Sequence, residues 1–202
     1  MKHLLAMETW KAALLLGPLG VVLLIAAWTD LRERKVYNKL TYPAILIGLL
    51  LHTITLGLDG LLSGLLAATL MLVIGLFLIV TPAIKGGDIK LLMVVGAFAG
   101  GKALLEVSFY AVFAGFFLGL FMSLKNGYLR VMLLRLWRLL KGYLLMILYR
   151  SRNFEPTLEE DERSKIPFAI AIFVGGVLVV TEHLYGLPGL LTWYASSLGF
   201  SL

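Results

Sequence analysis

The chain has 202 residues, of which 60% are hydrophobic and only 15% are charged, and its mean hydropathy is +0.93. A soluble domain of this length needs more polar surface, so the composition predicts a protein whose main solvent is the lipid bilayer. The absence of Cys excludes disulfides and Cys-based zinc sites, and three scattered His residues do not favour a His-rich metal site. No metal and no cofactor are therefore expected.

Apolar runs of membrane-spanning length follow one another along the chain. Such a run crosses the hydrocarbon core as a helix, because only a helix satisfies its own backbone there. The fourth run is short and glycine-rich, so it either begins below the membrane surface or belongs to a longer, broken segment. The runs lie at 12–29, 42–58, 61–80, 89–101, 103–124 and 166–184. The sequence thus predicts an all-α membrane protein, a single domain over 1–202 with about six transmembrane helices.

The net charge of +6 is distributed in a way that indicates orientation and not nucleic-acid binding. The connections 30–41, 81–90 and 125–165 hold 15 of the 18 Lys and Arg residues. Basic residues accumulate in cytoplasmic loops, so alternate connections are expected to face the cytoplasm of a prokaryotic inner membrane. Both termini are then expected on the outer side.

The connector 125–165 contains two charged segments. Residues 128–149 place Arg130, Arg135, Arg138 and Lys141 on one side of a helix with apolar residues around the rest. This pattern predicts a basic amphipathic helix in the inner headgroup layer, most simply a membrane-surface connector. Residues 155–162 carry five carboxylates, which indicates a solvated loop or, alternatively, a docking site for a basic segment.

Two aspartates at the cytoplasmic ends of helices are the candidate catalytic residues. Asp30 ends the first predicted helix, where the negative end of the macrodipole makes a carboxylate unfavourable. Taken alone, it can be an ordinary loop residue paired with Arg34 or Lys35. Asp88 opens the fourth predicted helix, where it can simply cap free N–H groups. The preceding Gly86 and Gly87 are either turn punctuation or an opening for close backbone approach.

The two aspartates together favour a catalytic interpretation. The first helix reaches the cytoplasmic surface at Asp30 and the fourth leaves it at Asp88, so both carboxylates share one depth. Two carboxyls in contact do not both ionise easily and share a proton. One can then deprotonate a water while the other protonates a leaving amine, which is the chemistry of aspartic proteolysis.

Two sequence stretches carry a family resemblance. Residues 30–40 (DLRERKVYNKL) and 86–92 (GGDIKLL) resemble the two signature regions of the type IV prepilin peptidases, membrane aspartyl proteases with a G-x-G-D motif. Residues 165–168 (KIPF) resemble the start of that family's last helix. The resemblance covers roughly 15–125 and 163–182.

The resemblance implies a function and a set of site residues. It maps the catalytic aspartates onto Asp30 and Asp88, with Asn38 and Lys90 in supporting positions. The implied substrates are prepilin or pseudopilin precursors of pilus and secretion systems, whose basic leader is removed at the cytoplasmic face. Gly86 and Gly87 are expected to let an extended substrate backbone lie against the enzyme.

Two positions depart from the family pattern. Lys85 replaces the first glycine of G-x-G-D, and Tyr37 replaces the usual proline before Asn38. Because it has no cysteine, the chain resembles the family's short, tight-adherence branch, and this resemblance implies that methyltransferase activity is not expected.

Two other interpretations remain open on the sequence. One is a catalytically silent assembly subunit of the same fold, in which Lys85 marks a degenerate site. The other is a small cation- or proton-coupled transporter, which the absence of a repeat and the edge position of the aspartates disfavour.

Overall fold

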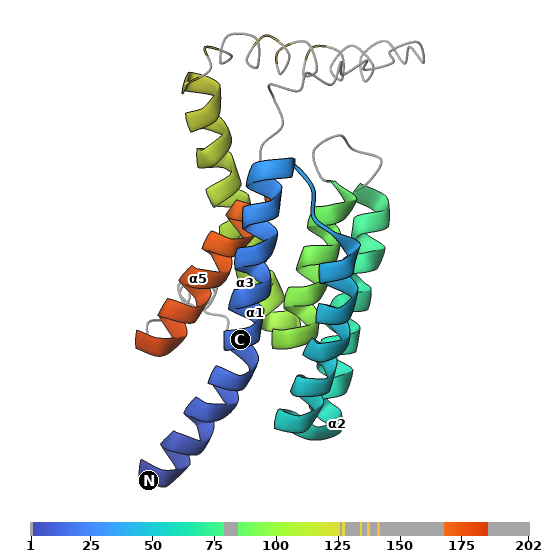
Figure 1. Cartoon of the computed structure of the whole chain (residues 1–202), viewed down its shortest axis with the longest axis vertical. Coiled ribbons are helices and arrows are strands. Elements are labelled where there is room, and N and C mark those ends of the chain that lie inside the picture. Colours follow the sequence, from blue (N-terminus) through green and yellow to red (C-terminus); the bar gives the residue numbers. More distant parts are fainter. Residues whose placement is uncertain are drawn as a thin grey trace. The chain divides into compact units, whose positions relative to one another are not determined.

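The structure is a computed structural model that describes residues 2–78, 85–125, 127, 134, 137, 141 and 168–185. Most of these residues are helical. No strand occurs in these ranges, so the all-α prediction is confirmed. The long helices are α1 (Lys2–Glu33), α2 (Asn38–Leu78), α3 (Gly86–Lys125) and α5 (Phe168–Tyr185) (Figure 1).

The chain divides into two compact units, one of Met1–Gly115 with Pro167–Leu202 and the other of Phe116–Ile166. The second unit contains the whole of the predicted connector 125–165. The predicted amphipathic helix 128–149 lies outside the described residues, apart from Leu134, Trp137 and Lys141, which are helical and exposed. The acidic stretch 155–162 lies wholly outside them. The assignment of one domain to 1–202 stays a prediction.

Both α2 and α3 are broken by a glycine near their middle. Gly57 has φ 69° and ψ −150°, and Gly100 has φ 75° and ψ −175°, values that L side chains rarely adopt. At each break the chain reverses direction (Figure 1), and Gly60 accordingly packs against the backbone of His52. The reversals fall where the sequence predicts boundaries between spans, near 58–61 and 101–103.

The lengths of these helices agree with this division. A straight helix of about 40 residues is roughly 60 Å long, about twice the thickness of the hydrocarbon core. The break at Gly57 leaves two segments of α2, each of about one membrane thickness, whereas the break at Gly100 leaves α3 with a shorter first segment, about 21 Å long, and a longer second one. Within the described residues, α2, α3 and Trp10–Glu33 of α1 are long and apolar enough to cross a membrane. The count of six spans stays a prediction.

The core of the first unit contains several alanines beside its larger apolar residues, and many large apolar side chains are exposed. Its core contains Ala26, Ala67 and Ala97, whereas Leu50, Leu66 and Phe77 are more than 60% exposed. On α5, a Cβ on Gly175 would lie 2.8 Å from the Val107 carbonyl oxygen, so α5 approaches α3 closely. Small residues between helices and large apolar residues outside are typical of packing in a lipid solvent.

Candidate active site

Asp30 lies in the last turn of α1 and is 4% exposed. The helix therefore ends three residues later than predicted, at Glu33. Asp30 Oδ2 accepts a hydrogen bond of 3.1 Å from the N–H of Ala169, the second residue of α5. The first N–H groups of a helix lack partners within it, and its positive dipole end favours an anion. The N-terminal end of α5 thus stabilises the Asp30 carboxyl, which the negative dipole end of α1 destabilises.

Arg34 terminates α1. Its N–H donates to the Asp30 carbonyl over 3.0 Å, and its φ of 56° is left-handed, the conformation that often closes a helix. Glycine or asparagine usually fills this position, because a Cβ makes the conformation costly. The chain then turns through Lys35, Val36 and Tyr37 before α2 begins at Asn38.

Asp88 lies in the first turn of α3 and is also 4% exposed. Lys85 caps that helix, since its carbonyl accepts hydrogen bonds from the N–H groups of Asp88 and Ile89. In return, Asp88 Oδ2 accepts the Lys85 N–H over 3.2 Å, as in one half of a capping box. Asp88 therefore does cap the helix, by reaching back to the capping residue.

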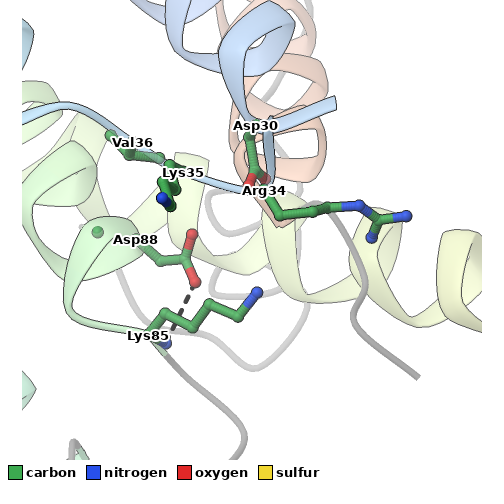
Figure 2. Close-up of a pocket in the computed structure, with 7 residues that line it drawn as sticks. Asp30, Arg34, Lys35, Val36, Lys85 and Asp88 are labelled. Atoms are coloured by element: carbon green, nitrogen blue, oxygen red, sulfur yellow. Dashed lines mark hydrogen bonds between the residues drawn. The ribbon is translucent and has the colours of Figure 1, made fainter. Parts of the chain in front are cut away.

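Both carboxyl groups line one pocket of about 230 Å³. Figure 2 shows the Asp30 side chain entering it from α1 and the Asp88 side chain from the start of α3. The remaining walls come from the loop after α1 and the start of α3: Arg34, Lys35, Val36, Lys85 and Gly87. The shared depth predicted for the two aspartates is thus accompanied by a shared pocket.

The four predicted supporting residues lie around this pocket in different ways. Gly87 lines it, and a Cβ there would lie 3.1 Å from the Cβ of Val36, so the glycine allows the loop to pack on α3. Gly86 is the first residue of α3 and is not among the lining residues. Lys90 Nζ donates a hydrogen bond of 2.8 Å to Asn38 Oδ1, which joins α3 to the start of α2.

Two features of the site have no clear signal in the sequence. The bond from Ala169 to Asp30 joins positions 139 residues apart and uses a backbone N–H, which any residue type supplies. The only hint is that 165–168 resembles a helix start. The sequence singles out Lys85 only as a departure from a motif, whereas the structure places it in the pocket wall beside Lys35 and Arg34.

The described residues contain no group of three or more His, Asp and Glu side chains placed to hold a metal ion. The pocket itself presents two carboxyls and three cationic side chains. Two carboxyls at one pocket can exchange protons with a bound water and with a leaving group. Acid–base hydrolysis is therefore the chemistry that these residues themselves can perform.

Comparison with known proteins gives one match. Residues 18–123, slightly more than half of the chain, match the sequence profile described as the type IV leader peptidase family. The matched range contains Asp30, Asp88, Asn38 and Lys90. Neither the curated proteins nor the solved structures contain a match.

Proposed function

This chain belongs to the type IV leader peptidase family, and from that premise we propose that it is an aspartic endopeptidase in which Asp30 and Asp88 activate water. Membership supports a leader-peptidase-like function and a multi-pass protein of the inner membrane. The observation that carries the catalytic assignment is the pocket into which α1 and α3 each deliver one buried carboxyl.

The proposed reaction needs one ionised and one protonated carboxyl. The ionised carboxyl takes a proton from water, whose oxygen attacks the scissile carbonyl carbon. The protonated carboxyl gives its proton to the amide nitrogen as the C–N bond breaks, so the products are a carboxylic acid and an amine. Positioned acid–base groups of this kind typically accelerate a reaction by about 10² to 10⁴-fold.

The proposed substrates are prepilin or pseudopilin precursors, in which a basic leader precedes an apolar helix. The apolar helix would enter the bilayer and leave the scissile bond at the cytoplasmic surface, level with the ends of α1 and α3. The bond must be extended there, because helical hydrogen bonding shields its carbonyl. Gly87 lines the pocket there, and its missing side chain leaves room for Val36 of the loop after α1.

Single substitutions of the two aspartates test the assignment. We expect Asp30→Asn and Asp88→Asn each to lower precursor cleavage at least about 100-fold, because an amide cannot exchange the required proton. Cleavage is measured by co-expression with pilin-like precursors from the same genome. Asp59→Asn is the matched control, since Asp59 is exposed on α2 and does not line the pocket.

The amount of each variant in the membrane must equal that of the parent. A loss of cleavage then reports a loss of catalysis and not a failure to fold. Full cleavage by either Asn variant would contradict the two-aspartate mechanism. Failure of the parent on every precursor would instead favour the silent assembly subunit.

A further inference from the structure

Cationic side chains outnumber carboxyls around the pocket. Its lining contains Arg34, Lys35 and Lys85 against Asp30 and Asp88. If the two carboxyls hold one proton between them, as the proposed mechanism requires, the lining carries an excess of two positive charges. Positive charge at the wall of a cleft attracts anionic groups and repels cationic ones. A basic leader residue is therefore disfavoured inside this pocket, although the leader as a whole is expected to be basic.

Lys85 is the cation most directly tied to the reacting groups. Its N–H is bonded to Asp88 Oδ2 over 3.2 Å, so its backbone is held beside that carboxyl. Its side chain is exposed, and Figure 2 shows it extending past the Asp88 carboxyl, below that carboxyl in the view. A substrate held at the two carboxyls would therefore pass within reach of the Lys85 ammonium group.

The length of this side chain limits which substrate residues it can reach. An extended peptide advances about 3.3–3.6 Å per residue, and a lysine side chain spans about two such steps. The pocket volume of about 230 Å³ holds only one or two side chains. An anionic partner must then lie within about two residues of the scissile bond.

We propose that Lys85 is a specificity-determining residue that, together with Lys35 of the same pocket lining, selects precursors carrying Asp or Glu within two residues of the cut. This inference rests on the proposed peptidase function and adds to it a feature of the substrate. Lys85 stands where the resembled motif has glycine, so the selectivity belongs to this chain and not to the motif.

A glutamate scan of a cleaved precursor tests the proposal. The full chain is reconstituted in phosphatidylcholine vesicles, and kcat/KM is measured for precursors with Glu or Gln at each position from five before to five after the cut. We expect Glu to exceed Gln by about fivefold at positions within two residues of the cut and by less elsewhere, the size of an exposed ion pair. Lys85→Gly should reduce that ratio to about one, and Lys85→Glu should favour a lysine at the same positions.

Lys39→Gln is the matched control, because it removes one lysine charge from α2 outside the pocket and should leave the Glu-to-Gln ratio unchanged. An equal rate for Glu and Gln at every position would overturn the proposal. So would a preference that Lys85→Gly leaves intact, or one that appears only when the vesicles contain anionic phosphatidylglycerol, which would assign the cations to lipid headgroups. Loss of all cleavage by the parent would refute the peptidase function itself, an outcome distinct from a flat scan.

Discussion

The hydrogen bond from Lys90 Nζ to Asn38 Oδ1 joins the first turns of α2 and α3 beside the pocket. Lys90 also lies 5.4 Å from the ring centroid of Tyr42, one turn further along α2. Asp88 is two residues before Lys90 on the same helix. A change in the Lys90–Asn38 hydrogen bond that moves the start of α3 therefore also moves the Asp88 carboxyl. These two residues therefore act as positioning residues in our interpretation.

A double-mutant cycle tests that role. We expect Asn38→Ala and Lys90→Met each to lower the free energy of unfolding by about 1 kcal/mol, the size of an ordinary hydrogen bond, because this charged bond is exposed to solvent. The double variant should lose little more than either single one, because both remove the same bond. Thermal unfolding in detergent and precursor cleavage are measured together, with Lys39→Met as the control lysine. Strictly additive losses would contradict a direct coupling between the two side chains.

The sequence predicts these site residues to different extents. Asp30, Asp88, Asn38 and Lys90 follow from residue type and motif, although their catalytic and supporting roles stay predictions. The hydrogen bond from the Ala169 N–H to Asp30 does not follow from the sequence, because any residue type supplies a backbone N–H. The sequence also does not predict that Arg34, Lys35 and Lys85 line one pocket. The left-handed conformation of Arg34 is also hidden, since arginine rarely occupies it.

At the scale of the helices, the breaks at Gly57 and Gly100 determine how the apolar runs are divided. The first segment of α3 ends at Gly100, where the helix leaves the carbonyls of its last turn without partners along the chain. The buried His52 side chain of α2 lies beside this break, since a Cβ on Gly100 would lie 3.3 Å from His52 Cε1. This contact brings α2 and α3 together at the break.

Alanine substitutions at two adjacent glycines test the break. We expect Gly100→Ala to lower the free energy of unfolding by about 2 kcal/mol, because L residues disfavour a φ of 75° and the new Cβ would lie 2.7 Å from Ser63 Oγ. Gly101→Ala should be neutral or stabilising, since nothing lies within 4 Å of its Cβ position. Thermal unfolding in detergent measures both. Equal stability of the two variants would argue against the break.

At the scale of the whole molecule, the orientation in the membrane stays a prediction from charge. The segment of α2 before Gly57 has about 20 residues, so its ends are about 30 Å apart, one hydrocarbon thickness. Lys39 and Asp59 mark these two ends. The positive-inside pattern places Lys39, and with it the pocket, at the cytoplasmic face.

Cysteine labelling tests the orientation cleanly, because the natural chain has no cysteine. We expect a membrane-impermeant maleimide to label Asp59→Cys in spheroplasts and to label Lys39→Cys only after the membrane is permeabilised. The parent chain is the background control. Labelling of Lys39→Cys in intact spheroplasts would invert the proposed topology and place the pocket on the outer side.

The sequence alone determined the membrane as solvent, the helical class and the division of α2 and α3 near 58–61 and 101–103, and it predicted the two aspartates as a pair. These follow from hydropathy, glycine and charge, which are local properties that the chain carries whatever its packing. Only the tertiary structure decided that α5 begins against Asp30, that Lys90 reaches Asn38 and that three cations line the pocket with the two carboxyls. These contacts join segments distant along the chain, and they depend on how the helix ends pack, which no local pattern specifies.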